Sequence, residues 1–286
     1  MGSVKKIKNI LDMIKFEHTI FALPFAYLGM VLGAGGLPPF YTFLWITLAM
    51  VGARSYAMAL NRLFDLNFDK KNPRTSAWSL SKGLVTVKET VALALVSLAV
   101  FFISVFMLPS LCYKLWPFVL LPMTFYSLAK RFTCLSHLFL GFCLGLAPLG
   151  AWVAVTNTMP PPGIWSLGLA VLFWTAGFDI IYSCQDYHFD KNEGLHSIPV
   201  RFGLKKALGF SKFFHVLTIF FLVLLGKSFS LSPVFYIGII LIALFLWYEN
   251  SIVTAEDLSR INVSFFTLNG FVSIFTFVFT FISILE

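Results

Sequence analysis

Residues 54–75 read RSYAMALNRLFDLNFDKKNPRT and place a run of polar side chains at the end of an apolar stretch. Asn61, Asp65 and Asp69 are spaced four residues apart. On a helix each such step advances by only about 40°, so the three side chains share one face. Arg54 lies on the same face, about two turns earlier. The spacing predicts a helix with one polar face, and we call Asn61, Asp65 and Asp69 the first stripe.

A second acidic stretch lies downstream, where residues 179–190 read DIIYSCQDYHFD. Spacings of seven and four place Asp179, Asp186 and Asp190 within about 40° of one another on a helix, with Tyr182 adjoining them. We call these three carboxylates the second stripe. The two stripes hold five of the thirteen acidic residues of the chain, and we expect them to face each other.

The composition is that of a membrane protein. Hydrophobic residues make up 58% of the 286 and charged residues 12%, with a mean hydropathy of +0.86, whereas a soluble domain carries about a quarter charged residues. The apolar runs are about 17 to 25 residues long, which predicts spanning helices rather than alternating strands. The basic residues lie in short loops between these runs, so the net charge of +8 indicates membrane orientation and not a nucleic-acid partner.

Nine apolar spans indicate an all-α, polytopic membrane protein with about nine transmembrane helices around a central cavity, as a single domain over residues 1–286. The expected spans are 17–34, 41–64, 84–107, 114–130, 135–156, 164–186, 208–228, 231–249 and 262–284. Pro117 and Pro122 interrupt the fourth of them.

The distribution of Lys and Arg predicts the orientation. If the N-terminus is cytoplasmic, 19 of the 21 basic residues lie on that side, and only Lys114 and Lys227 lie opposite. The positive-inside rule then gives a cytoplasmic N-terminus and an external C-terminus. Both stripes fall at cytoplasmic helix ends. We therefore expect an active site toward the cytoplasm.

A short internal match suggests two related halves, roughly 1–133 and 134–286. Residues 65–70 read DLNFDK and residues 186–191 read DYHFDK. Each copy lies at the end of an expected apolar helix and at the start of a long loop. This pattern is typical of membrane proteins built from two helical repeats around one site.

Carboxylates at membrane depth are costly, so they usually pair, bind ions or line a wet cavity. One stripe alone could simply cap a helix end. Two stripes of matched spacing among basic residues instead suit an anionic ligand carried with Mg²⁺, which prefers carboxylate, water and phosphate oxygens. Four scattered cysteines and five histidines show no metal-ligand spacing. We expect the cysteines to act as apolar residues and most histidines as interfacial polar residues.

These motifs resemble a known family. N-x-x-x-D-x-x-x-D at residues 61–69, followed by NPRT at 72–75, resembles the first signature of the UbiA superfamily of intramembrane aromatic prenyltransferases. Residues 179–190 resemble its second signature, D-x-x-Y-x-x-x-D-x-x-x-D, and residues 126–133 (YSLAKRFT) its basic segment before the fifth helix. Residues 18–27 are similar to the first helix of the 4-hydroxybenzoate branch. The likeness covers about residues 10–212, and departs from the family at Trp78, where Arg is common.

The resemblance implies Mg²⁺-dependent transfer of a polyprenyl group from its diphosphate to an aromatic ring carbon. It implies metal ligands at Asp65, Asp69, Asp186 and Asp190. Diphosphate contacts are expected from Asn61, Arg54, Lys70, Lys130 and Arg131. Asp179 and Tyr182 are expected to orient or deprotonate the phenolic acceptor.

The opening helix and the NPRT run favour 4-hydroxybenzoate as acceptor, hence ubiquinone biosynthesis in a bacterial inner membrane. A dihydroxynaphthoate acceptor on a menaquinone route is the alternative. A transporter is a more distant alternative, disfavoured because the neighbouring basic residues would repel cations. A CDP-alcohol phosphotransferase needs D-G where Asp65 is followed by Leu66.

Overall fold

The computed structural model describes residues 3–16 and 19–286, and its regular elements there are all helical. The chain runs through α1 (Ser3–Met13), α2 (Thr19–Ala34), α3 (Phe40–Lys71), α4 (Val87–Phe106), α5 (Ser110–Phe125), η2 (Tyr126–Arg131), α6 (Ser136–Thr156), α7 (Pro162–Ser183), η3 (Cys184–Asp186), α8 (Tyr187–Asn192), α9 (Ile198–Phe202), α10 (Leu204–Ser228), α11 (Pro233–Ser251), η4 (Val263–Leu268) and α12 (Asn269–Leu285).

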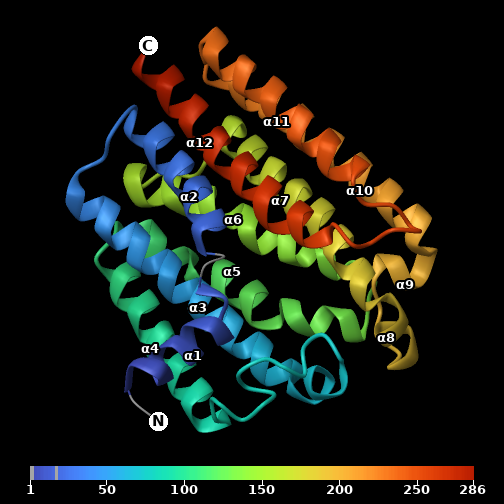
Figure 1. Cartoon of the computed structure of the whole chain (residues 1–286). Coiled ribbons are helices and arrows are strands. Elements are labelled where there is room, and N and C mark those ends of the chain that lie inside the picture. Colours follow the sequence, from blue (N-terminus) through green and yellow to red (C-terminus); the bar gives the residue numbers. More distant parts are fainter. Residues whose placement is uncertain (1–2, 17–18) are drawn as a thin grey trace.

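The polytopic helical architecture predicted from hydropathy is confirmed. Within the described part of the chain, seven helices are long and apolar enough to cross a membrane. The other two expected spans fall on α2 and α5, which have 16 residues each. All nine spans therefore coincide with helices, while nine crossings and a cytoplasmic N-terminus stay predictions. Helix α1 and the C-terminal end of α12 lie at opposite ends of the bundle, and the ends of α3 and α8 lie at the end that holds α1 (Figure 1).

Helix α3 positions the first stripe. Its 32 residues correspond to about 48 Å, well beyond the ~30 Å hydrocarbon core, so its polar end extends past the apolar layer. It ends at Lys71, because Asn72 takes an extended conformation ahead of Pro73. The connection over residues 72–86 then leads to Thr86, whose side chain forms a capping box with Glu89 at the start of α4.

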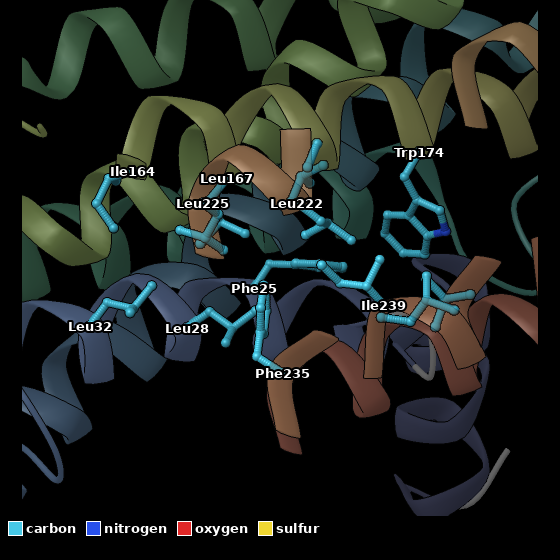
Figure 2. Packing of buried hydrophobic residues seen from close by; sticks show 14 of the residues in the cluster. Phe25, Leu28, Leu32, Ile164, Leu167, Trp174, Leu222, Leu225, Phe235 and Ile239 are labelled. Carbon is cyan, nitrogen blue, oxygen red and sulfur yellow. The ribbon is translucent and has the colours of Figure 1, made fainter. Parts of the chain in front are cut away.

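Helix α7 carries Asp179 of the second stripe and lies at the centre of the packing, whereas Asp186 lies on η3 and Asp190 on α8, because the helix expected over the stripe is interrupted after Ser183. Helix α7 packs most extensively against α6 and α10. In Figure 2 its Trp174 faces apolar side chains of α2, α10 and α11, among them Phe25, Leu222 and Ile239. Trp174 is 1% exposed, so the core fixes α7 from several sides.

Glycines on α6 let α7 approach closely. A Cβ placed on Gly145 would lie 2.5 Å from the carbonyl oxygen of Gly168, and one on Gly141 would clash with the carbonyl of Leu172. Gly141 and Gly145 form a G-x-x-x-G pair, the spacing that favours close contact of helices in membranes. Close α6–α7 packing brings the start of α6 beside the polar half of α7.

Helix α1 is amphipathic and lies against the loop before α4. Lys6 forms an ion pair with Glu89 at 2.7 Å and donates to the Leu84 carbonyl at 3.1 Å. Its other end is buried, where Met13 packs in one cluster with Leu80. The helix therefore braces the 72–86 connection near the first stripe.

Candidate active site

Asp65 is the most enclosed member of the first stripe, at 4% exposure. Asn61 Nδ2 donates to its Oδ2 at 3.1 Å, so the two residues share a face as their spacing predicted. Lys130 Nζ lies 2.8 Å from the same oxygen. Arg131 Nη2 lies 3.8 Å from Oδ1 and donates to the Phe64 carbonyl at 2.6 Å. A carboxylate as buried as that of Asp65 thus has the cationic partners that it requires.

Lys130 and Arg131 reach α3 because of the local fold of η2. Helix α5 gives way after Phe125 to this six-residue 3₁₀ segment, which ends at Arg131. The backbone carbonyl of Lys130 also accepts from the His196 N–H at 2.7 Å. The basic segment is therefore anchored to the loop after α8 while its side chains point to α3.

Asp69, one turn beyond Asp65, faces Arg62. Arg62 Nη1 lies 3.7 Å from Asp69 Oδ2, and its Nε donates to the Met13 carbonyl at 3.1 Å. The guanidinium also stacks on the Trp78 ring, 3.8 Å from the ring centroid. Thr75 Oγ1 donates to the Asp69 carbonyl at 3.0 Å. The end of α3 is thus tied to both α1 and the connection that follows.

The NPRT run joins the two stripes. Arg74 makes a bidentate contact with Asp186, from Nη2 to Oδ2 at 2.5 Å and from Nε to Oδ1 at 2.9 Å, and Nη1 donates to the Tyr182 hydroxyl at 2.9 Å. Asn72 Nδ2 donates to Asp186 Oδ1 at 2.8 Å. Burial lowers the pKa of Arg74, but the hydrogen bond and charge of Asp186 outweigh it and raise that pKa above its usual value. Arg74 therefore stays charged.

Asp179 pairs with a histidine that the sequence did not suggest. His137 Nδ1 lies 2.7 Å from Asp179 Oδ2, and the Ile198 N–H donates to its Nε2 at 3.4 Å. Since Nε2 accepts, the proton of the neutral ring belongs on Nδ1, facing the carboxylate. His137 is 3% exposed. It holds one oxygen of Asp179 in a fixed direction.

The expectation that most histidines are interfacial does not hold for two of the four described histidines. His137 and His215 are buried, with Asp179 and Asn250 as partners, because an imidazole inside a helix bundle needs a hydrogen-bonding neighbour. His188 and His196 are exposed, and His18 lies outside the described residues. The four cysteines are unpaired and half-buried or buried, as expected of apolar residues.

The remaining predicted residues lie further from these contacts. Lys70 is exposed at the end of α3 and, within the described residues, pairs with neither stripe. Asp190 is half-buried on α8, one turn beyond Asp186. Arg54 lies about 10 Å along α3 from Asn61. The structure therefore brings Asn61, Asp65, Lys130 and Arg131 together directly.

Arg54 lines an apolar cavity of about 670 Å³ between α3, α4, α5 and α6. It is the one charged residue among the described lining residues, which include Ala53, Phe101 and Cys143. Phe118 also lines the cavity and is 69% exposed, so the cavity opens at the outer face of the bundle. The predicted cavity is thus present, with its opening toward lipid.

A family model described as the UbiA prenyltransferase family matches residues 22–275. The chain belongs to this family. It is a prenyltransferase, and the resemblance of its motifs is confirmed. Membership in this family also excludes the transporter alternative.

Two curated relatives of this UbiA protein share one name. This chain is 31% identical over 217 residues to a 4-hydroxybenzoate octaprenyltransferase of Francisella tularensis subsp. novicida (strain U112). The aligned residues cover 76% of this chain and 75% of the relative. This chain is 30% identical over 229 residues to a protein of that name from Vibrio atlanticus (strain LGP32), covering 80% of each.

Solved structures of UbiA proteins share the fold. The apo structure of a UbiA homologue from Aeropyrum pernix K1 superposes with a TM-score of 0.84 and 34% identity, over 93% of this chain and 98% of that one. A homologue from Archaeoglobus fulgidus bound to GPP and Mg²⁺ superposes with a TM-score of 0.75 over 97% and 100%, at 19% identity. The second likeness concerns the fold alone.

The donor set of this UbiA protein suits Mg²⁺ chemically. Both stripes offer hard carboxylate oxygens, and the buried Oδ1 of Asp65 has no hydrogen-bond partner within the described residues. No group of three His, Cys, Asp or Glu in the described residues is close enough to hold a metal ion by itself. Lys130 and Arg74 instead neutralise Asp65 and Asp186. Metal binding therefore requires these cations to turn toward an anionic ligand.

Sequence reasoning gave no role to Asn72, Arg74 or His137. The first two belong to the quoted NPRT run, and the signal was available there, because an Arg beside a turn near carboxylates is a natural partner for them. No local signal connects His137 with Asp179, since 42 positions separate them. That contact depends on the close packing of α6 and α7.

Proposed function

We propose that the protein transfers a polyprenyl group from polyprenyl diphosphate to a ring carbon of 4-hydroxybenzoate, releasing diphosphate. The observation that carries this proposal is the joining of the two stripes: Asp65 with Lys130 and Asp186 with Arg74, linked through the 72–75 run and next to an apolar cavity. Mixed fixed charges suit a diphosphate, and the cavity suits its hydrocarbon chain.

The diphosphate would bind where carboxylates and cations now pair. Lys130, Arg131 and Arg74 would turn from the carboxylates to phosphate oxygens, which are stronger acceptors with higher charge. Mg²⁺, when bound by Asp65, Asp69, Asp186 and Asp190, would neutralise charge on the leaving diphosphate. Asn61 would orient the site through Asp65. Lys70 remains a weaker candidate for phosphate contact, because it is exposed and points from the last turn of α3.

The polyprenyl chain would lie in the apolar cavity. Ionisation of the allylic carbon–oxygen bond sends the electron pair to the diphosphate and leaves a cation that water would quench. The lining is apolar except for Arg54, and it includes the aromatic rings of Phe101 and Trp116. The cavity opening at Phe118 would admit the chain from the bilayer.

The acceptor would bind between Arg54 and Asp179. Arg54 was expected at the diphosphate, but its place in the cavity favours pairing with the carboxylate of an aromatic acid. Asp179, held at one oxygen by His137, would take the phenolic proton, and Tyr182 would orient the ring. The ring carbon then forms the new bond to the prenyl carbon, and its own proton leaves to restore aromaticity.

The location that fits this chemistry is a bacterial inner membrane with the site toward the cytoplasm. The C-terminal end of α3 and helix α8, which hold members of the two stripes, lie at the same end of the bundle as α1 (Figure 1), and the distribution of Lys and Arg predicts that this side is cytoplasmic. The bacterial relatives named 4-hydroxybenzoate octaprenyltransferase support this location and the proposed acceptor.

A transfer assay tests the proposal. Purified protein in detergent receives geranyl diphosphate and labelled 4-hydroxybenzoate, with Mg²⁺ or with EDTA. We expect a prenylated acid and an equal amount of diphosphate with Mg²⁺ only. Transfer to 1,4-dihydroxy-2-naphthoate but not to 4-hydroxybenzoate would show that the acceptor is a dihydroxynaphthoate and not 4-hydroxybenzoate. Absence of transfer to either acceptor, with folded protein, would reject the proposed reaction.

A further inference from the structure

The Trp78 ring lies close to two arginines, one beside each stripe. Its ring centroid is 3.8 Å from the Cζ of Arg62 and 5.4 Å from the Cζ of Arg74. Arg62 faces Asp69 of the first stripe, and Arg74 holds Asp186 of the second. One side chain therefore contacts the cationic partners of both stripes.

The backbone around Trp78 is held in place by its own segment. The Trp78 backbone N–H donates to the Thr75 carbonyl at 3.0 Å, and the Trp78 carbonyl accepts from the backbone N–H of Lys82 at 2.9 Å. Leu80, two residues further, is buried in the cluster with Met13. Arg62 in turn donates to the Met13 carbonyl. The segment that carries Trp78 and the Arg62 side chain thus both contact the part of the core around Met13.

The contact with Trp78 offsets the repulsion between two neighbouring arginines. Guanidinium groups repel each other, and an aromatic ring beside both attracts each of them through its quadrupole. An arginine stacked on an aromatic ring contacts it with the flat face of the guanidinium. The N–H donors, which lie at the edge of the guanidinium, therefore stay free for hydrogen bonds. Arg74 indeed donates to Asp186 and Tyr182 while it lies near the ring.

We propose that Trp78 is a positioning residue for diphosphate recognition: it holds Arg62 and Arg74 at a fixed separation, with their donors directed toward the space between the stripes. The inference rests on the proposed function and deepens it. Another arginine at this position, as is common in the family, would add charge to the site. A tryptophan adds no charge and instead orders the two cations already present.

The test compares Trp78→Phe, which keeps an aromatic face, with Trp78→Leu and Trp78→Met, which remove it. Loss of both cation–π contacts is expected to raise the KM for geranyl diphosphate about tenfold. The KM for 4-hydroxybenzoate should change less than the KM for geranyl diphosphate, because Arg74 reaches the proposed acceptor site only through the Tyr182 hydroxyl. Trp78→Phe should stay within about threefold of wild type. Trp247→Leu is the matched control, since Trp247 is 70% exposed on α11.

Calorimetric binding of inorganic diphosphate with Mg²⁺ provides a readout independent of turnover. The aliphatic variants should bind it about tenfold more weakly than wild type, with melting temperatures close to that of Trp247→Leu. Unchanged affinity in a folded Trp78→Met protein would overturn the inference. So would a Trp78→Phe variant as impaired as Trp78→Leu, which would indicate packing alone. Wild-type protein that binds diphosphate but transfers no prenyl group would count against the proposed reaction instead.

Discussion

At the scale of single residues, the site is organised by arginine geometry. Arg74 uses three nitrogens on two residues of α7 and η3, the Tyr182 hydroxyl and both oxygens of Asp186. A planar guanidinium with five donors permits this, and an ammonium does not. Arg74 is therefore the residue through which the connection after α3 holds the second stripe.

The change Arg74→Lys keeps the charge and removes this geometry. Loss of hydrogen bonds to a charged partner costs about 2 kcal/mol, so kcat/KM for geranyl diphosphate should fall about 30-fold. Steady-state kinetics at varied concentrations of geranyl diphosphate measure this change in kcat/KM. Lys71→Arg is the control, because Lys71 pairs with Glu193 at the surface. Equal kinetics of Arg74→Lys and wild type would contradict the role assigned to the bidentate contact.

At the scale of elements, the position of α7 decides whether the site forms. Its packing against α6 depends on glycine, and this packing puts His137 next to Asp179. On the other side, η4 is a π-helix, and its Phe265 ring lies 4.2 Å from the Tyr182 ring, centroid to centroid. A buried hydrogen-bond network supports η4, and in it Glu249 accepts from Ser264 and Asn269. π-Helical turns are frequent at functional sites.

The change Gly145→Ala tests the α6–α7 contact. The new methyl would meet the Gly168 carbonyl at 2.5 Å, and overpacking of this kind costs about 1–3 kcal/mol. We expect a lower melting temperature in detergent and a loss of transfer activity on mild heating. Gly150→Ala on the same helix is the control, since nothing lies within 4 Å of its added methyl. Similar melting of the two variants would show that this glycine is not required for close packing.

Much of the fold followed from sequence at this scale. Apolar runs predicted every long helix, because a segment that crosses lipid must satisfy its own backbone. The expected span 262–284 reads as one apolar run, yet it begins as the π-helix η4. Hydropathy does not distinguish these two helix types. Four-residue spacing correctly predicted the shared face of Asn61 and Asp65, which are in contact.

The partners of the stripes were less accessible to sequence reasoning. Asn72, Arg74 and Trp78 act from a connection whose path is set by tertiary packing against α1. His137 depends on a contact between helices. Periodicity describes which residues of one helix lie together, but it carries no information about which loop folds over them. Contacts of this kind therefore required the structure.

At the scale of the whole molecule, charge and apolar space are separated along α3. Asn61, Asp65 and Asp69 lie in the C-terminal half of α3, whereas Arg54, which lines the cavity, lies about two turns before Asn61. This arrangement suits a substrate with an ionic head and a hydrocarbon tail. It also explains why the active site needs both halves of the chain: one stripe comes from each.

If the two stripes bind one diphosphate together, as we propose, then tight binding of geranyl diphosphate needs carboxylates from both, and its binding to four proteins measures this. Calorimetry with Mg²⁺ compares wild type, Asp65→Asn, Asp186→Asn and the double variant. We expect wild-type protein to bind one equivalent of geranyl diphosphate and to lose this binding when EDTA is added. Each single variant should lose at least about tenfold in affinity, and the double variant should lose less than the two losses combined, because both residues serve one ligand. Wild-type affinity in either single variant would contradict the claim.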